Sequence, residues 1–377
     1  MVLDRFESST AAVMVAVGVG SLYEEKERRG ITHLLEHMLF RVPDFDVDEA
    51  VESLGGSNNA YTQRDFLMVT LEAVSESAPG LVELAYRLYV NSRYAEEDLL
   101  RERDVVLSEL RQAREDPSSR VGELGVRALF GESDWGDPVG GTPETVSAIT
   151  LMDLVEFKER WFTPDNTVVV LSGGFGEEAV KRVAELFGGL TGTKPARRRP
   201  AATSGPRLIV EERDIDGVYY AKALRLSVDD PASLYALLYG AAFHLEAGTK
   251  SILFHILRTG GIAYSYYVDY DVVGDTAYLE IVVESARSLE ETRRAVEEAL
   301  KPREPPRYRL RFYDYVWRVE WRSAVNRAVA IAEFLAKGGS PEAIADVFKK
   351  AAERGTAWLP PYVVDVGEAA LIPENYK

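Results

Sequence analysis

A proline-rich segment divides this sequence near its middle and limits what either half can fold into. Residues 191–206 read TGTKPARRRPAATSGP, with three prolines, two glycines and no apolar period, which is typical of an exposed linker. The chain has 377 residues, whereas a single core rarely serves more than about 250–300 residues. We therefore predict one domain over residues 1–190 and a second over residues 207–377.

Both halves alternate between short β-rich runs and amphipathic helical runs, a pattern typical of α+β domains. Thr150 and Asp153 form a capping-box pair that predicts the start of a helix ending near Phe162. The predicted strands of the first half are residues 11–19, 66–74 and 167–171, and its other predicted helices are a helix start over residues 30–40, residues 78–90 and residues 96–114.

Short landmarks of the first half recur in the same order in the second half. In each half a glycine pair precedes an Ala-Tyr pair, then strand residues, then a Glu-Ser-Ala triplet and a predicted helix. The order favours a duplicated domain, with chance similarity of two α+β domains as the alternative. The landmarks lie at residues 55–56, 60–61 and 76–78, and at residues 260–261, 263–264 and 284–286.

The charge balance of the chain argues against two classes of partner. With 44 basic and 61 acidic residues, the net charge is −17, which disfavours nucleic acid and anionic membranes. The one basic cluster, Arg197 to Arg199, lies in the linker. A solvated linker is favoured there over a nucleic-acid site.

Three features that the sequence lacks bear on the cellular compartment we expect for the protein. No run of about 18 apolar residues predicts a transmembrane helix, and the first residues lack the basic and apolar regions of a secretory signal. The chain has no cysteine, which excludes disulfides and thiolate ligands and is compatible with a reducing environment. We therefore expect a cytoplasmic protein.

The four histidines of the chain include one pair with the spacing of metal ligands. His33 and His37 are four residues apart in a predicted helix, so both imidazoles lie on one face and can reach one ion. Glu36 borders the same face, which gives the order H-x-x-E-H. Neutral imidazoles suit Zn²⁺, and a catalytic zinc site needs three protein ligands and an open position for water. The motif therefore predicts a zinc site whose third ligand lies elsewhere in the chain.

A later predicted helix offers two carboxylates as the third ligand. Glu102 and Glu109 are seven residues apart, two turns along one face. Carboxylates on an inward face are costly unless they are paired or bind a metal. The alternative is an exposed acidic stripe paired with neighbouring arginines, and the residues alone leave both interpretations open. Those arginines are Arg101, Arg103, Arg111 and Arg114.

Together these segments resemble the M16 metallopeptidases, the family of pitrilysin, the insulin-degrading enzyme and the mitochondrial processing peptidase. The resemblance is carried by GITHLLEHMLF, SLGGSNNAYTQRDF and ERDVVLSEL. It continues through GGTPETVSAITLMDLVEFKERWFTPDNTVVVLSGG and, in the second half, LRTGGIAYSYYVDY, so it covers most of the chain. It implies two related α+β domains, each a largely antiparallel sheet with helices packed on one face.

The resemblance implies a zinc-dependent endopeptidase and assigns roles within the first domain. His33, His37 and Glu109 match the three zinc ligands of the family, and Glu36 matches the general base that activates the attacking water. Glu102 matches a carboxylate that orients a ligand histidine. Glu109 follows His37 a few residues sooner than is usual in the family.

The resemblance also implies how a peptide or unfolded polypeptide is bound. Asn59, Ala60 and Tyr61 match an edge strand that pairs with the backbone of an extended peptide, and backbone pairing makes few demands on sequence. Arg258 and Tyr264 match a substrate-anchoring pair of the second domain, one residue closer together than is usual.

The length resembles the short-subunit branch of the family, in which two chains pair to enclose a chamber. A homodimer is favoured because one chain carries both the zinc motif and the Arg-Tyr pair, and a heterodimer with a related subunit stays open. Two other functions are weighed. The intact set of His33, Glu36 and His37 disfavours a non-catalytic or partner-dependent subunit, and the edge-strand motif disfavours a zinc hydrolase of other substrates.

Overall fold

The chain forms two compact units, described by a computed structural model that covers all residues except 228, 375 and 377. The boundary at residue 199 falls inside the predicted linker, and residues 191–206 form no helix or strand. The first unit comprises Met1–Leu110, Pro138–Arg199 and Trp317–Ala336, and the second comprises Arg111–Asp137, Pro200–Val316 and Lys337–Lys377.

The first unit is built on a five-stranded mixed sheet in the order β1-β5-β2-β4-β3. β1 and β5 run parallel, and the other neighbouring pairs are antiparallel. Apolar side chains fill the three central strands, as in sheets that are covered on both faces. The strands are β1 (Val2–Arg5), β2 (Thr10–Val17), β3 (Gly56–Thr62), β4 (Leu67–Val74) and β5 (Thr167–Gly173).

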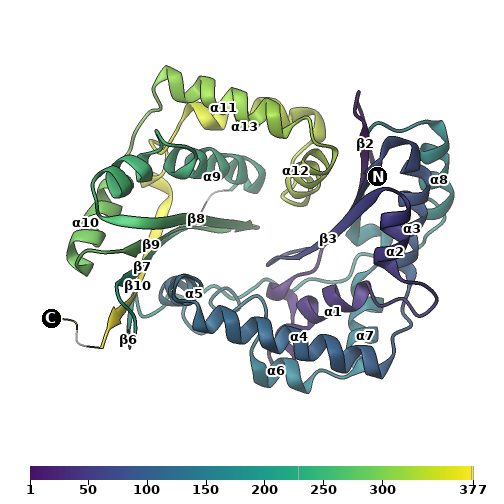
Figure 1. Cartoon of the computed structure of the whole chain (residues 1–377), viewed down its shortest axis with the longest axis horizontal. Coiled ribbons are helices and arrows are strands. Elements are labelled where there is room, and N and C mark those ends of the chain that lie inside the picture. The colour runs from purple at the N-terminus through teal and green to yellow at the C-terminus, as the bar shows by residue number, and fades with distance from the viewer. Residues whose placement is uncertain (228, 375, 377) are drawn as a thin grey trace. The chain divides into compact units, whose positions relative to one another are not determined.

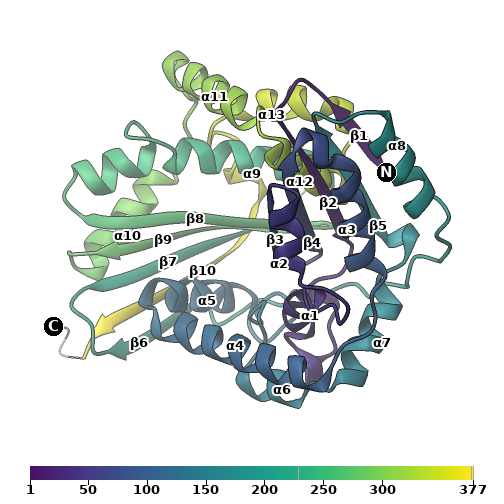
Figure 2. The same cartoon turned by 45° about the vertical axis from the view of Figure 1, so that its right-hand side comes forward.

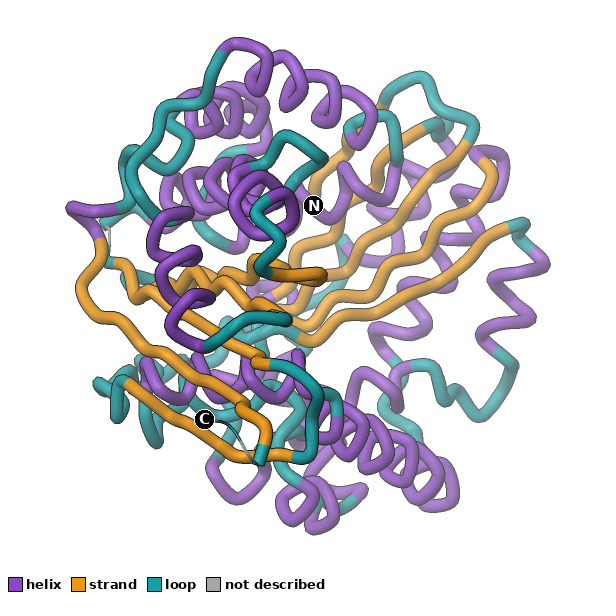
Figure 3. Tube along the Cα trace, turned by 60° about the vertical axis from the view of Figure 1, so that its left-hand side comes forward, coloured by secondary structure: helices purple, strands orange, loops and turns teal. Residues whose placement is uncertain are grey.

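The second unit repeats this sheet strand for strand, in the order β6-β10-β7-β9-β8 with β6 and β10 parallel. Figure 2 shows β8, β9, β7 and β10 side by side, and Figure 3 shows the strands in orange. Gly55 and Gly261 take φ values of 69° and 67° just before the corresponding edge strands, which agrees with the predicted duplication. The strands are β6 (Leu208–Arg213), β7 (Val218–Leu226), β8 (Ala263–Val273), β9 (Thr276–Ser285) and β10 (Val363–Pro373).

Helices cover both faces of the first sheet. Residues 11–17 of β2 are all buried, which requires cover on both sides of the strand. Alternate residues such as Val13 belong to the core that α3 (Ala78–Val90) shares. Residues between them, such as Met14, are buried on the opposite side, where α12 (Ala324–Ala336) crosses β2 and β5.

The second sheet is covered in the same way, by a helix from the first half of the chain. α5 (Pro117–Phe130) packs Val121 and Leu124 against Val282 on one face. α9 (Pro231–Glu246) contributes to the core on the other face. Both faces of each sheet are thereby removed from water.

Each unit therefore holds one helix from the other half of the sequence, α12 in the first unit and α5 in the second. The α+β class with two domains and largely antiparallel sheets is confirmed. The prediction of helices on one face is incomplete, because each sheet carries a second helical layer. The predicted domain ranges, 1–190 and 207–377, group α5 with the first sheet and α12 with the second. In the structure each of these two helices belongs to the other unit. Apolar periodicity shows that a helix has a buried face but not which sheet buries it.

The remaining helices are labelled in Figure 1. Thr150 caps α7 with Asp153 as its reciprocal partner, as predicted. Among the described residues, no helix is both long enough and apolar enough to cross a membrane. These helices are α1 (Ile31–Leu39), α2 (Val47–Ser53), α4 (Glu96–Glu115), α6 (Pro143–Ala148), α7 (Leu151–Trp161), α8 (Glu177–Phe187), α10 (Leu289–Ala299), α11 (Arg307–Glu320) and α13 (Ile344–Glu353).

An ion pair fastens α12 to the first sheet. Arg327 donates from Nε to Asp4 Oδ2 at 2.7 Å and from Nη2 to Asp4 Oδ1. Ser172 donates to the same carboxylate at 2.8 Å. The side chains of Arg327 and Asp4 are only 17% and 15% exposed. A largely buried pair of this kind is stabilising only while both partners are present.

We predict that Arg327→Leu lowers the free energy of unfolding by about 3 kcal/mol, because it leaves the Asp4 carboxylate buried without its cation. Adding Asp4→Leu should recover most of this loss, since no charge then stays buried. Chemical denaturation of the wild type, both single variants and the double variant measures the coupling. An Arg327→Leu protein as stable as the wild type would contradict this attachment of α12.

Candidate metal centre

The helix α1 has a buried apolar face and an opposite polar face. The helical period places His33, Glu36 and His37 on the polar side. The rings of the two histidines lie one turn apart, with centroids separated by 5.0 Å and planes at 82°. The apolar residues, which fill the core of the first unit, are Ile31, Leu34, Leu35, Met38 and Leu39.

Glu109 reaches the histidine pair from the helix α4. Its Oε2 lies 3.6 Å from His33 Nε2 and 3.5 Å from His37 Nε2. Within the described part of the chain, these three residues are the one group of histidines and acids able to hold a metal ion, with ligand atoms within 4.8 Å of one another. Ligands of a tetrahedral zinc ion, each about 2.1 Å from the metal, are about 3.4 Å apart. The two separations between Glu109 and the imidazoles fit such an ion.

A second carboxylate of α4 holds the other ring nitrogen of His37. Glu102 Oε2 is 3.1 Å from His37 Nδ1, and the Glu102 side chain is only 7% exposed. Arg41 donates from Nε to Glu102 Oε1 at 2.6 Å. With Nδ1 turned to a carboxylate, His37 keeps Nε2 free for a metal. Arg41 was not among the predicted site residues, because it follows the end of α1 and lies outside the motif that carries the histidines.

Burial shifts the pKa of one predicted ligand, His33, and of the predicted base, Glu36. Burial, together with the nearby His37, lowers the pKa of His33 to about 4, so this imidazole is neutral near pH 7 and available as a ligand. Burial also raises the pKa of Glu36 above its usual range, although a hydrogen bond from the Thr62 hydroxyl opposes the shift. Thr62, the last residue of β3, was also not predicted, because no motif marks a strand residue that meets a distant helix.

The predicted substrate-binding residues lie on β3, the edge strand of the first sheet, which contacts α1. Gln63 donates to Phe66 O at 2.9 Å in the hairpin, so alternation turns the backbone groups of Ala60 toward the free edge. The N–H of Ala60 donates to Asn59 Oδ1 at 2.9 Å, and Asn59 Nδ2 donates to the Tyr61 hydroxyl at 2.9 Å. The structure brings these residues together beside α1, the helix that carries His33 and His37, which is called the metal helix below. Their pairing with a substrate stays a prediction.

The predicted anchoring pair lies in the second unit. Arg258 is on the π-helix Phe254–Thr259, and its Nη1 donates to Tyr264 O at 2.9 Å. The guanidinium lies 3.9 Å from the centroid of the Tyr264 ring, and this tyrosine is 81% exposed. The two residues meet despite their shortened spacing, and their role in binding stays a prediction. The remaining histidines, His244 and His255, are buried and exposed respectively.

Two family models match most of the chain between them. Residues 1–142 match the model described as Insulinase (Peptidase family M16), and residues 148–301 match Peptidase M16 inactive domain. The chain belongs to the M16 peptidase family. His33, Glu36, His37 and Glu109 all lie within residues 1–142, so this M16 chain carries its candidate metal centre in the segment that matches the insulinase model.

Known proteins are similar to this M16 chain in sequence or in fold. An uncharacterized zinc protease of Mycobacterium leprae is 33% identical over 285 residues, 72% of this chain but only 63% of that longer protein. A protease from Helicobacter pylori matches with a TM-score of 0.84 at 18% identity, over 97% of this chain and 94% of that one. A peptidase M16 inactive domain from Pseudomonas fluorescens gives 0.82 at 15% identity, with coverage of 100% and 96%.

We predict that Glu109→Ala retains the fold, because this side chain is 45% exposed, but falls well below about one zinc ion per chain through loss of the third ligand. Elemental analysis after dialysis against a weak chelator measures the zinc content. Glu97→Ala is the control, since Glu97 lies on the same helix, is 76% exposed and pairs with Arg101. Full zinc content in the Glu109→Ala protein would place the third ligand elsewhere.

Proposed function

We propose that this chain is a zinc-dependent peptidase that hydrolyses peptides or unfolded polypeptide segments. The observation that carries the proposal is the convergence of His33, His37 and Glu109 at separations that fit a zinc ion. Glu36 lies between the two histidines on the same helix, which places a carboxylate beside the predicted ligands as the candidate general base. The naming of relatives as zinc proteases supports the choice of metal.

His33, His37 and Glu109 would hold Zn²⁺, which would supply a Lewis acid to acidify water and polarise the scissile carbonyl. Glu36 takes the proton of the attacking water on one carboxylate oxygen while the Thr62 hydroxyl holds the other. A C–O bond forms at the carbonyl carbon and the peptide C–N bond breaks. Glu36 returns the proton to the leaving amine, which leaves a carboxylate and an amine as products.

The edge strand β3 supports the substrate class in this proposal. An extended peptide pairs with a free strand edge through backbone hydrogen bonds, which selects a polypeptide over other hydrolysable substrates. Such pairing displaces Asn59 Oδ1 from the N–H of Ala60. Anchoring by Arg258 and Tyr264, and pairing of the chain as a homodimer or with a related subunit, stay predictions.

A non-catalytic or partner-dependent subunit is the second candidate function. The description of the model that matches residues 148–301 as an inactive domain favours it. The candidate metal centre lies outside that segment, and its ligand set and base are all present. These two observations together favour a catalytic chain.

We predict that Glu36→Gln binds zinc as the wild type does but loses about 10²–10⁴-fold in kcat, because an amide cannot accept the proton of water. Cleavage of an unstructured peptide and zinc content are measured on the same samples. Glu52→Gln, at an exposed position of α2, is the control and should behave as the wild type.

The same assay with a chelator separates the two candidate functions. Removal of the metal should abolish wild-type cleavage, and added zinc should restore it. Turnover by the Glu36→Gln protein would rule out the assigned base. Zinc without cleavage in the wild type would support the partner-dependent subunit instead.

A further inference from the structure

The metal helix α1 begins without a capping side chain of its own. Gly30 occupies the N-cap position, where Ser, Thr, Asp or Asn usually accepts a hydrogen bond from a free N–H of the first turn. Glycine has no side chain to accept one. The first N–H groups of the helix that carries His33 and His37 therefore need an acceptor from outside the helix.

The close approach of another loop explains why residue 30 is a glycine. Gly30 has a φ of 90°, a left-handed conformation that favours glycine, and a Cβ there would lie 2.4 Å from Gly140 O. A Cβ on Gly140 would in turn lie 2.8 Å from Leu110 Cδ2 and 3.5 Å from His33 Nδ1. Packing beside the metal helix thus excludes a capping side chain at residue 30.

Glu24 supplies the missing acceptors from the segment that precedes the helix. Its Oε2 accepts the N–H of Gly30 at 2.8 Å, and its Oε1 accepts the N–H of Thr32 at 2.9 Å. The residue is 0% exposed. Its carboxylate lies at the positive end of the helix dipole, which favours an anion. Glu24 is not a member of the predicted ligand set, and the proposed hydrolysis does not use it.

Only a carboxylate can accept both hydrogen bonds. A glutamine has one oxygen and one NH₂ group, so one of the two backbone donors would face another donor. Burial of an acid is costly, and it raises the pKa of Glu24 to about 7, although the two N–H bonds and the charge of Arg29 oppose the shift. The two N–H bonds offset part of the cost of burying this acid beside α1.

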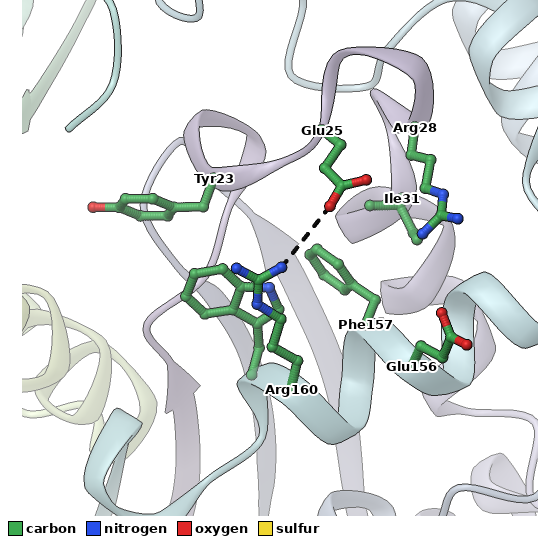
Figure 4. A pocket seen from close by; sticks show the side chains of 8 residues that line it. Tyr23, Glu25, Arg28, Ile31, Glu156, Phe157 and Arg160 are labelled. Atoms are coloured by element: carbon green, nitrogen blue, oxygen red, sulfur yellow. Dashed lines mark ion pairs between the residues drawn. The ribbon is translucent and has the colours of Figure 1, made fainter. Parts of the chain in front are cut away.

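Arg198 binds the backbone of Glu24, whereas the side chain of the next residue, Glu25, is exposed. Figure 4 shows Glu25 on the segment before α1 and its pairing with Arg160. The N–O distance is 3.9 Å and the two side chains are 63% and 57% exposed, so this surface pair adds little to the stability of the segment. Glu25 lines a cavity of about 140 Å³ together with Ile31, the first residue of the helix. Arg198 Nη2 donates to the backbone carbonyl of Glu24 at 3.1 Å. The bond from Arg198 helps to keep the Glu24 carboxylate against the first turn of α1.

We propose that Glu24 is a positioning residue for the metal centre, an inference that rests on the proposed zinc site. Its bonds to Gly30 and Thr32 fix the first turn of α1 and so the direction in which His33 and His37 present Nε2. His33 directly follows Thr32, so rotation of this turn moves its imidazole. Loss of the cap weakens metal binding rather than peptide binding, because these side-chain bonds go to α1 and not to β3.

The test compares Glu24→Gln with Glu25→Gln, the same substitution at the next residue, whose side chain is 63% exposed. Competition with a chromogenic chelator measures zinc affinity, and the visible absorption of Co²⁺-substituted protein reports the ligand geometry. Cleavage of an unstructured peptide yields kcat and KM separately. Glu24→Asp, which keeps both oxygens on a shorter side chain, is the conservative variant.

We expect Glu24→Gln to bind zinc about tenfold or more weakly, to shift the Co²⁺ spectrum, and to lower kcat with KM unchanged. Glu24→Asp should recover part of the affinity, and Glu25→Gln should match the wild type. Wild-type zinc affinity and Co²⁺ spectrum in a less stable Glu24→Gln protein would indicate a purely structural cap and overturn the proposal. If Glu24→Gln does not fold, Glu24→Asp decides, with weakened zinc binding as support and wild-type binding as refutation.

Zinc affinity does not depend on turnover, which separates this proposal from the proposed function. A wild type that binds zinc without cleaving peptides overturns the peptidase function, and the variant affinities still decide the role of Glu24. A wild type that cleaves peptides, with equal zinc affinity in Glu24→Gln, overturns the role of Glu24 alone. A wild type that binds no zinc overturns both.

Discussion

The burial of one face of α1 is the constraint on which the metal centre depends. Leu34, Leu35 and Met38 are fully buried in the core of the first unit, so the helix cannot rotate without exposing apolar surface. With that face fixed, His33 emerges on the opposite side, where α4 brings Glu109 within 3.6 Å. Core packing thus assembles ligands that a metal ion would otherwise have to gather at a cost in chain entropy.

Three carboxylates, Glu36, Glu102 and Glu109, lie beside the histidine pair, and each has a partner of its own. Glu102 is bound by Arg41, Glu36 is bound by the Thr62 hydroxyl, and Glu109 faces the two imidazole Nε2 atoms. Separate partners allow acids with different tasks to stand close together in a partly buried site. A metal ion between the imidazoles and Glu109 would complete this balance of charge.

One sheet topology occurs twice in this chain, and the metal ligands occur in one copy. Both sheets end on an edge strand, β3 in the first and β8 in the second, and each edge strand carries a residue predicted to contact substrate, Tyr61 and Tyr264. The exchange of α5 and α12 buries the second face of each sheet. Neither half of the sequence therefore contains the whole core of its own sheet.

The sequence by itself determined which residues share one face of a helix, because that depends only on local periodicity. The helical period set His33 and His37 on one face of α1, and the family resemblance indicated Glu109, whereas the residues of α4 alone left an exposed acidic stripe open. Only the tertiary structure decided that Glu109 of α4 faces the two histidines and that Arg41 donates a hydrogen bond to Glu102. The crossing of helices, the exchange of α5 and α12 and the cap from Glu24 depend on contacts between segments apart in sequence, which no local pattern records.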